Sequence, residues 1–267
     1  MRGALIERVL ERLAVERPAP DLGGLRRVYD AWCQAVPFDN VHKLLHLAER
    51  RPGPLPGSTP EAFFAAWLSD GTGGTCWAGN GALHALLVGL GFAAERAAGT
   101  MLVGPDTPGP NHGSVVVSLA EGRYLVDASI LSGAPLRLPE PGEPADLEAP
   151  LPRIEWLGEH PVVRWRTVRD PQGFLCRIER VGLPAAEWDE RHQRTAAGSP
   201  FNTALSVRAR RGPGTIGFGL GQRFAFDARG ALSVEPRDRA GRDRFLVQEL
   251  GVSPALVARL PDDLPPP

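Results

Sequence analysis

Three residues whose types together can carry out nucleophilic catalysis stand in separate segments of the chain: Cys76, His112 and Asp127. Cys76 lies in GTGGTCWAGN, after a run of small residues and before an apolar pattern typical of an amphipathic helix. The thiolate is the nucleophilic form of cysteine, and a helix N-terminus or a neighbouring imidazolium favours it. Gly73 and Gly74 would let the backbone approach a ligand closely, and the amides at the helix start could receive a developing oxyanion.

A cysteine nucleophile needs a base, and the base needs an orienting carboxylate. His112 stands where a Pro- and Gly-rich loop meets an apolar run, and Asp127 ends the run RYLVD, where an unpaired buried carboxylate would be costly. A two-residue hairpin at Glu121-Gly122 would place Asp127 opposite Val116, roughly 13 Å along the strand from His112. A longer loop, a bulge or strong curvature must then close that gap.

The remaining cysteines and histidines have simpler interpretations. Buried cysteines often act as small hydrophobes, a reading that fits Cys33 and Cys176 and, taken alone, would also fit Cys76. His42 and His46 have the i, i+4 spacing of metal ligands, but no third ligand accompanies them, so we predict no metal site.

The elements that must position the three residues change in type along the chain. Amphipathic helical patterns fill residues 1–91, and a helix is expected to begin at or just after Cys76. Short β-like runs follow over 92–195, interrupted by the Pro- and acid-rich loop PEPGEPADLEAP. Residues 196–267 contain further β-like runs and then two helical patterns. The glycines of TIGFGLGQ are interpreted as a turn between strands. These three ranges are predicted to be a helical bundle with the nucleophile, a β-barrel with the histidine and aspartate, and an α/β lid.

The net charge, the number of cysteines and the length of the apolar runs narrow the classes of function. A formal net charge of -1 gives no bulk electrostatic attraction to nucleic acid or to an anionic membrane, so small-molecule partners are favoured. Three widely spaced cysteines predict neither a disulfide framework nor a thiolate zinc site. With no signal-peptide pattern and no apolar run of membrane-spanning length, the sequence predicts a cytoplasmic protein.

Four segments, in order, resemble motifs of the arylamine N-acetyltransferases. AVPFDNVHK is similar to the family's PFEN segment, TGGTCWAGN to R-G-G-x-C-x-E-x-N, NHGSVVVSL to the strand with the catalytic histidine, and LVDASI to V-D-x-G-F-G. The intervals of 36 residues from Cys76 to His112 and 15 from His112 to Asp127 also match. The resemblance covers nearly the whole chain and implies an α+β, three-part fold with a papain-like Cys-His-Asp core.

The resemblance also implies a function. Cys76, activated by His112 and Asp127, would take an acyl group from acetyl-CoA or another acyl thioester in a ping-pong reaction and pass it to an arylamine-like acceptor, with no metal. The substrate-binding positions implied are Phe38, Gly73, Gly74, Thr75, Ser129 and Ile130.

The chain departs from the family pattern at several positions. Asp39 replaces the glutamate of PFEN, and Thr72 and Ala78 stand for the usual arginine and glutamate, so an ion pair between the first helices and the cysteine loop is expected to be absent. Ser129, Ile130 and Leu131 replace Gly, Phe and Gly. Two alternatives therefore stay open: an amide synthase of natural-product biosynthesis that uses a thioester on an acyl carrier protein, and a non-catalytic small-molecule-binding relative.

Overall fold

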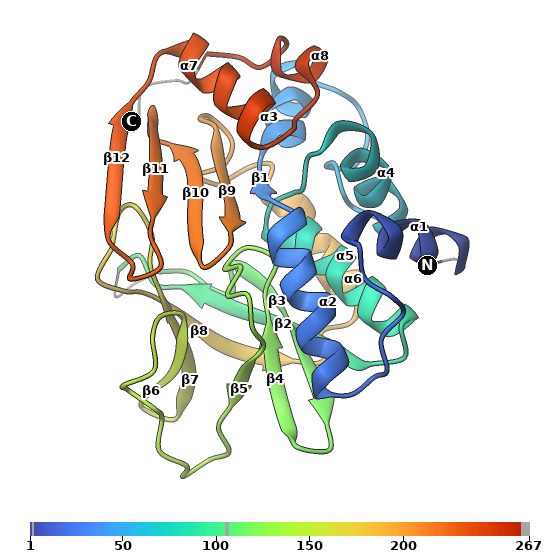
Figure 1. The fold of residues 1–267 in the computed structure, drawn as a ribbon, viewed down its shortest axis with the longest axis vertical. Coiled ribbons are helices and arrows are strands. Elements are labelled where there is room, and N and C mark those ends of the chain that lie inside the picture. The colour runs from blue at the N-terminus through green and yellow to red at the C-terminus, as the bar shows by residue number, and fades with distance from the viewer. Residues whose placement is uncertain (2, 105–106, 263–267) are drawn as a thin grey trace.

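The computed structural model describes residues 1, 3–104 and 107–262, so the end of the predicted lid, residues 263–267, lies outside them. Figure 1 shows helices packed along one side of two sheets that lie one above the other. The fold is α+β, as predicted. The helices of the first segment are α1 (Gly3–Leu13), α2 (Leu22–Ala35), α3 (Val41–Ala48), α4 (Pro60–Asp70) and α5 (Cys76–Gly89).

The local sequence explains where these helices begin and end. Asp21 caps α2 by accepting a hydrogen bond from the Gly24 N–H, and Thr59 caps α4 in the same way ahead of a proline at the first helical position. Helix α4 ends at Gly71, whose φ of +71° is a left-handed conformation that glycine adopts without strain. The sequence analysis did not predict the short helix α3.

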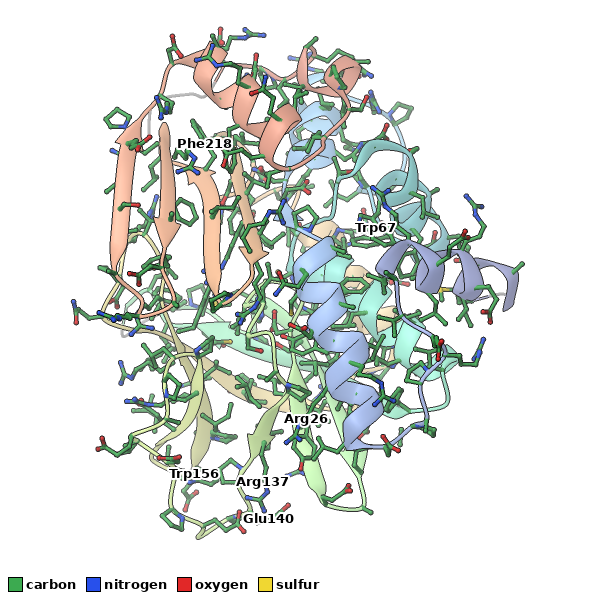
Figure 2. All side chains as sticks on the ribbon, viewed as in Figure 1. Arg26, Trp67, Arg137, Glu140, Trp156 and Phe218 are labelled. Atoms are coloured by element: carbon green, nitrogen blue, oxygen red, sulfur yellow. The ribbon has the colours of Figure 1, made fainter. Side chains whose placement is uncertain are left out.

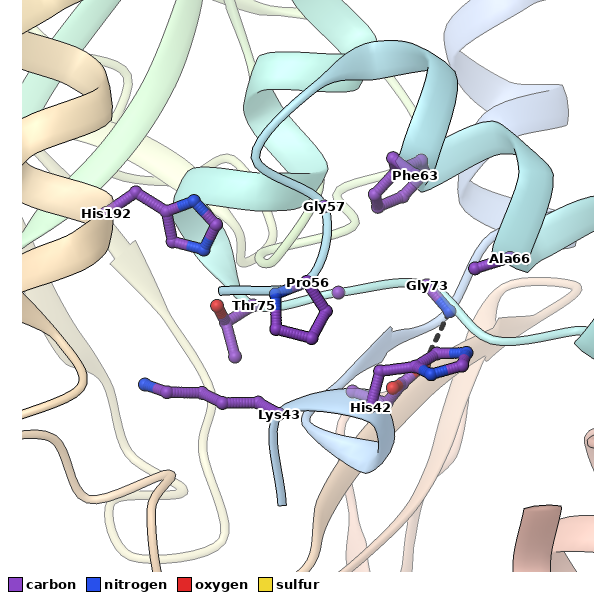
Figure 3. A pocket seen from close by; sticks show the side chains of 11 residues that line it. His42, Lys43, Pro56, Gly57, Phe63, Ala66, Gly73, Thr75 and His192 are labelled. Carbon is purple, nitrogen blue, oxygen red and sulfur yellow. Dashed lines mark hydrogen bonds between the residues drawn. The ribbon is translucent and has the colours of Figure 1, made fainter. Parts of the chain in front are cut away.

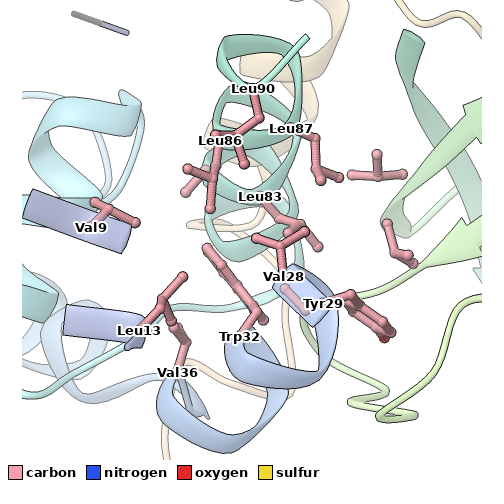
Figure 4. Packing of buried hydrophobic residues seen from close by; sticks show 14 of the residues in the cluster. Val9, Leu13, Val28, Tyr29, Trp32, Val36, Leu83, Leu86, Leu87 and Leu90 are labelled. Atoms are coloured by element: carbon pink, nitrogen blue, oxygen red, sulfur yellow. The ribbon is translucent and has the colours of Figure 1, made fainter. Parts of the chain in front are cut away.

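The core of the helical part is built from the apolar stripes that the sequence indicated. Figure 4 shows Trp32 and Val28 of α2 facing Leu83 and Leu86 of α5, with Val9 of α1 beside them. All five side chains are buried. Burial of such large apolar side chains fixes the direction of α5, and so the position of the residue at its start.

A seven-stranded antiparallel sheet forms a nearly closed barrel in the order β5-β4-β3-β2-β8-β7-β6, and its edge strands β5 and β6 contact each other. Its strands are β2 (Ala93–Met101), β3 (His112–Leu119), β4 (Gly122–Val126), β5 (Leu136–Leu138), β6 (Arg153–Leu157), β7 (His160–Trp165) and β8 (Phe174–Val181). The acidic loop separates β5 from β6, as predicted; these two short strands were not predicted.

The hairpin between β3 and β4 corrects the predicted register. Its turn residues are Ala120 and Glu121, because Gly122 already pairs with Leu119. Val126 lies opposite Val115, so the next residue reaches the level of Ser114 and not of Val116. The ladder also stops there, which frees the chain to bend. The expected gap of four residues between His112 and Asp127 is therefore halved.

The second sheet has the order β1-β9-β10-β11-β12 and joins distant parts of the chain. Its strands are β1 (Phe38–Asp39), β9 (Ser206–Arg211), β10 (Gly214–Gly219), β11 (Gln222–Phe226) and β12 (Leu232–Pro236). Helix α6 (Ala185–Arg194) precedes it, and α7 (Arg239–Arg244), the π-helical turn η1 (Phe245–Glu249) and α8 (Pro254–Val257) follow it. The segment TIGFGLGQ does contain a turn between strands, Leu220–Gly221, but its glycines Gly217 and Gly219 lie in strand β10 and not in the turn.

Side chains fill the space between these layers (Figure 2). Trp67 of α4 lies in the core of the helical part, and Phe218 of β10 lies in a separate core under the terminal helices. No helix in the described ranges combines the length and the apolar character that crossing a membrane requires.

Candidate active site

Cys76 is the first residue of α5, where the sequence predicted it. Thr75 occupies the N-cap position in an extended conformation, and its side chain makes no capping hydrogen bond. Cys76 packs in a small apolar cluster with Trp77, Ala98 and Trp188, and 8% of its surface is exposed. The thiol therefore lies at the positive end of a helix, in a site with little access for water.

The loop before Cys76 is tied to β1. The Gly73 N–H donates to Asp39 Oδ2 over 2.5 Å, and the Asp39 N–H donates to the Gly74 carbonyl over 3.3 Å. A Cβ on Gly73 would lie 1.8 Å from the Pro37 carbonyl oxygen, so this approach requires glycine. Burial raises the pKa of the Asp39 carboxyl, although the backbone donors oppose it. Asp39 therefore connects β1 to the cysteine loop through backbone hydrogen bonds.

His112 and Asp127 meet in the interior. His112 Nε2 lies 2.7 Å from Asp127 Oδ2, and both residues are 2% exposed. Burial alone would lower the pKa of His112, but the Asp127 charge, the hydrogen bond to Asp127 and the nearby Cys76 side chain raise it well above its usual value. Burial would raise the pKa of Asp127, and His112 together with several donors lowers it instead. The pair is thus arranged to hold an imidazolium beside a carboxylate.

Several residues hold Asp127 in place, and two of them, Ser114 and Asn80, were not singled out by the sequence analysis. Ser114 donates to Oδ2, and the backbone N–H groups of Ser129 and Ile130 donate to Oδ1 over 2.7 and 3.1 Å. Asn80 donates to the Gly113 carbonyl and to Asp127 Oδ1 over 2.6 and 3.3 Å, and accepts from the backbone after Asp127. Asn80 ends the motif around Cys76, so its position in that motif was the signal that could have identified it.

The predicted substrate-binding residues fall into separate places. Phe38 packs edge-to-face on Phe201, with ring centroids 5.1 Å apart. Gly73, Gly74 and Thr75 line a small cavity beside the cysteine loop. Ser129 is buried in the turn after Asp127, and Ile130 lines a different small cavity. The six predicted substrate-binding residues therefore do not line one common cavity in the described structure.

The first cavity contains Lys43, the one lysine of the chain. Its Nζ donates to the carbonyl and hydroxyl oxygens of Thr195 over 3.1 and 3.0 Å. Figure 3 shows its side chain extending below Thr75 toward the side of the cavity from which His192 projects. Burial lowers the pKa of Lys43 to about 8, while Cys76 raises it. Sequence reasoning assigned no role to Lys43 or His192: Lys43 ends the segment AVPFDNVHK, but no local pattern places it beside the cysteine loop, and His192 lies in no motif.

Cys33 and Cys176 pack as small hydrophobes, as predicted, and His84 has a backbone partner. Cys33 and Cys176 are buried, and burial raises the pKa of each thiol to about 12, which keeps it protonated and unreactive. Burial lowers the pKa of His84 to about 4, and its ring hydrogen-bonds the Ala94 carbonyl. The described part of the chain contains no group of three or more acidic, histidine or cysteine residues that could hold a metal ion.

Comparisons with known proteins agree with this architecture. A family model described as N-acetyltransferase matches residues 21–150. An arylamine N-acetyltransferase of Mycolicibacterium smegmatis is 31% identical over 223 residues, covering 74% of both chains. A solved M. smegmatis arylamine N-acetyltransferase aligns with a TM-score of 0.79 and 25% identity over 96% of this chain and 97% of that one. The Mycobacterium marinum enzyme aligns with a TM-score of 0.78 and 24% identity over 96% and 98%.

The likeness in fold extends over almost the whole of both chains and confirms the predicted α+β architecture. The sequence identity to the curated relative extends over about three quarters of each chain. The chain therefore belongs to the arylamine N-acetyltransferase family, a family of acyl-transferring enzymes.

Proposed function

We propose that this protein is a cysteine-dependent acyltransferase that moves an acetyl group from acetyl-CoA to an arylamine through an acyl-enzyme on Cys76. One observation carries the proposal: the buried His112 is hydrogen-bonded to Asp127, and the Cys76 side chain that begins α5 interacts with the same imidazole. A base held by a carboxylate and placed beside a thiol is the arrangement that generates a nucleophilic thiolate.

In the first half-reaction, His112 takes the thiol proton and the Cys76 sulfur attacks the thioester carbonyl. Backbone amides in the first turn of α5 face the developing oxyanion, because Thr75 does not cap them with its side chain. The tetrahedral intermediate collapses with cleavage of the C–S bond to CoA, and His112 returns its proton to the departing thiolate. Asp127 stays ionised and keeps the imidazole oriented.

In the second half-reaction, the amine attacks the thioester on Cys76 while His112 accepts the amine proton. Collapse releases the amide and returns the proton to the Cys76 sulfur. The cluster of Trp77, Ala98, Leu183 and Trp188 limits water around the thioester and so disfavours hydrolysis.

We assign acetyl-CoA and an arylamine as substrates from the similar proteins. The similar proteins are named arylamine N-acetyltransferases, and the M. marinum enzyme has a structure in complex with CoA. A carrier-protein thioester is the alternative donor, suggested by Ser129 and Leu131 in place of the family's glycines and Ile130 in place of its phenylalanine. Acylation by acetyl-CoA at a rate at least equal to that by carrier-linked acetyl groups supports coenzyme A; a strong preference for the carrier supports the alternative.

The test is steady-state acetyl transfer to an arylamine by wild type, Cys76→Ser and the matched control Cys33→Ser. We expect Cys76→Ser to lose turnover and Cys33→Ser to retain it, because Cys33 is a buried protonated thiol in the helical core. Full turnover by Cys76→Ser would overturn the proposal, and a wild type that binds small aromatic amines without turnover would favour a non-catalytic relative.

A further inference from the structure

The hydroxyl group of Tyr29 lies in the interior, where α2 packs against the end of β4. Tyr29 is fully buried, and Figure 4 shows its ring pointing from α2 toward the green segments of the barrel. The hydroxyl oxygen lies 3.0 Å from the backbone nitrogen of Asp127, 3.0 Å from its carbonyl oxygen and 2.9 Å from Ser132 Oγ. One side chain of the helical part therefore contacts both backbone polar groups of a triad residue that follows it by 98 positions.

The backbone N–H of Asp127 depends on this hydroxyl. The ladder between β3 and β4 ends with the pair Val115 and Val126, so no strand residue pairs with Asp127. Tyr29 is the one acceptor that this N–H has among the described residues. The carbonyl of Asp127, in contrast, has a second donor in the Leu131 N–H at 3.1 Å. Because a buried N–H without an acceptor is costly, Tyr29 stabilises the chain at the point where the strand ends and the turn begins.

Tyr29 is a neutral donor and acceptor at neutral pH. Burial raises the pKa of its phenol well above the ordinary value, and the neighbouring Cys33 and the Asp127 charge raise it further. A protonated hydroxyl donates one hydrogen bond and still accepts others. It can therefore accept from the Asp127 N–H and donate to the Asp127 carbonyl at the same time, which fixes the peptide groups on both sides of that residue.

The backbone position of Asp127 determines where its carboxylate points. The N–H groups of Ser129 and Ile130, which hold Oδ1, belong to the same turn and move with it. A shift of this turn therefore moves the carboxylate and two of its donors together, away from the imidazole of His112 on β3. The Nε2–Oδ2 distance of 2.7 Å leaves little tolerance for such a shift, because hydrogen bonds weaken steeply with poor alignment.

The other side of the turn is held by a different element. Arg210 of β9 donates from Nη1 to the carbonyls of Leu131 and Ser132 over 3.3 and 3.1 Å. These contacts fix the end of the turn, four and five residues after Asp127. Tyr29 fixes its beginning, at the triad residue itself.

We propose that Tyr29 is a positioning residue for acyl transfer, whose hydroxyl holds the backbone of Asp127 and thereby directs the carboxylate that orients His112. The inference rests on the proposed acyl transfer and adds to it a residue from a helix that carries none of the triad. Tyr29 acts through Asp127 and needs no contact with substrate. Because His112 serves both half-reactions, loss of the hydroxyl should slow both and lower kcat, with little change in KM for acetyl-CoA.

The experiment compares Tyr29→Phe with Tyr124→Phe, which is the matched control. Tyr124 is the other tyrosine of the chain, lies buried in the same core, and makes no hydrogen bond through its hydroxyl in the described ranges. Each change removes one oxygen atom and keeps the ring. Tyr29→Phe should reduce kcat roughly 10- to 100-fold, as expected for a misplaced catalytic group, with KM for acetyl-CoA within about twofold of wild type. Tyr124→Phe should leave both values within about twofold of wild type.

The titration of His112, followed by NMR, separates positioning from a loss of stability. A misdirected carboxylate stabilises the imidazolium less, so the pKa of His112 should be lower in Tyr29→Phe than in wild type. Val28→Ala, at the preceding position of α2, loses apolar packing in the same core. It should lower the urea midpoint of unfolding and leave kcat and the His112 titration as in wild type.

Four results would each overturn the positioning role. They are a wild-type kcat in Tyr29→Phe, an unchanged His112 titration, an equal loss of kcat in Val28→Ala, and a Tyr29→Phe chain that does not fold, since the proposed role concerns the reaction and not the fold. Failure of the wild type to form an acyl-enzyme with acetyl-CoA would overturn the proposed acyl transfer instead. The His112 titration would still decide whether Tyr29 positions Asp127.

Discussion

Asn80 lies one helical turn after Cys76, and its side-chain amide donates to Asp127 Oδ1 over 3.3 Å. The same amide bonds the Gly113 carbonyl, next to His112. One side chain on the nucleophile's helix therefore connects to both strands that carry the other two residues. This links the start of α5 to the barrel and sets the distances within the triad.

We predict that Asn80→Ala reduces acyl transfer more than it reduces stability. The change leaves the Gly113 carbonyl and the Ala128 N–H without partners, at a cost of about 1–3 kcal/mol. Misplacement of Asp127 should lower kcat roughly 10- to 100-fold. Urea unfolding and acetyl-transfer kinetics check both. A kcat equal to that of wild type in a folded variant would show that Asn80 does not position the triad.

Asp127→Asn should lower the pKa of His112 and reduce the rate on the order of 10²–10⁴-fold. The Asp127 charge holds the pKa of His112 above its ordinary value, so the imidazolium contributes stability at low pH that is lost as pH rises through the folded pKa. The variant should lose this contribution. NMR titration of the imidazole together with the pH profile of Cys76 alkylation provides the check; an unchanged histidine titration would contradict the assigned pairing.

The sole lysine gives a direct report on the nucleophile. Cys76 raises the pKa of Lys43, which burial lowers to about 8. Cys76→Ser should therefore lower the pKa of Lys43 further, and acylation of the cysteine should do the same. Isotope-labelled lysine gives a single resonance whose pH titration measures the change. Cys33→Ser removes a protonated thiol and should leave the pKa of Lys43 unchanged. Equal lysine titration curves for the two serine variants would contradict an electrostatic interaction between Cys76 and Lys43.

Leu131 tests how the turn after Asp127 tolerates its unusual sequence. Its φ is +53°, although its side chain is buried in the main core. Leu131→Ala loses apolar packing and keeps the left-handed backbone, whereas Leu131→Gly loses the packing and relieves the strain. Both should be destabilised, but the glycine variant by roughly 1 kcal/mol less than the alanine variant. Denaturant unfolding decides; a less stable glycine variant would mean that the strain is negligible.

Asp39→Ala should loosen the cysteine loop. It removes the acceptor of the Gly73 and Val41 N–H groups, at an expected cost of about 1–3 kcal/mol. Asp30→Ala, at an exposed position on α2, is the matched control and should stay within about 0.5 kcal/mol of wild type. Thermal unfolding and the rate of acyl-enzyme formation measure the effect, and equal behaviour of the two variants would remove Asp39 from this role.

Local signals were sufficient to predict much of this molecule. The helix start at Cys76 and the run that became β3 follow from short-range rules of capping and periodicity. The predicted register of the β3–β4 hairpin was wrong. The turn could lie at Ala120-Glu121 or at Glu121-Gly122, and the alternation of apolar residues does not specify which two residues form the first pair of the ladder.

The contacts between distant segments could not be predicted in the same way. Lys43 meets Thr195 across 152 residues, and Arg208 and Arg210 reach one cavity with Arg166 only because two sheets pack together. The connection through Asp39 is a similar case: the change from glutamate predicted a lost ion pair, while the shorter side chain instead reaches the backbone of Gly73. Such outcomes depend on tertiary distances that no local pattern contains.

The most direct test of the central claim is the intact mass of the protein after incubation with acetyl-CoA, compared with Cys76→Ala. The account predicts that wild type gains the mass of one acetyl group, that the gain disappears on addition of an arylamine, and that the alanine variant gains nothing. An unmodified wild type, or an adduct of equal size on Cys76→Ala, would contradict an acyl-enzyme on Cys76.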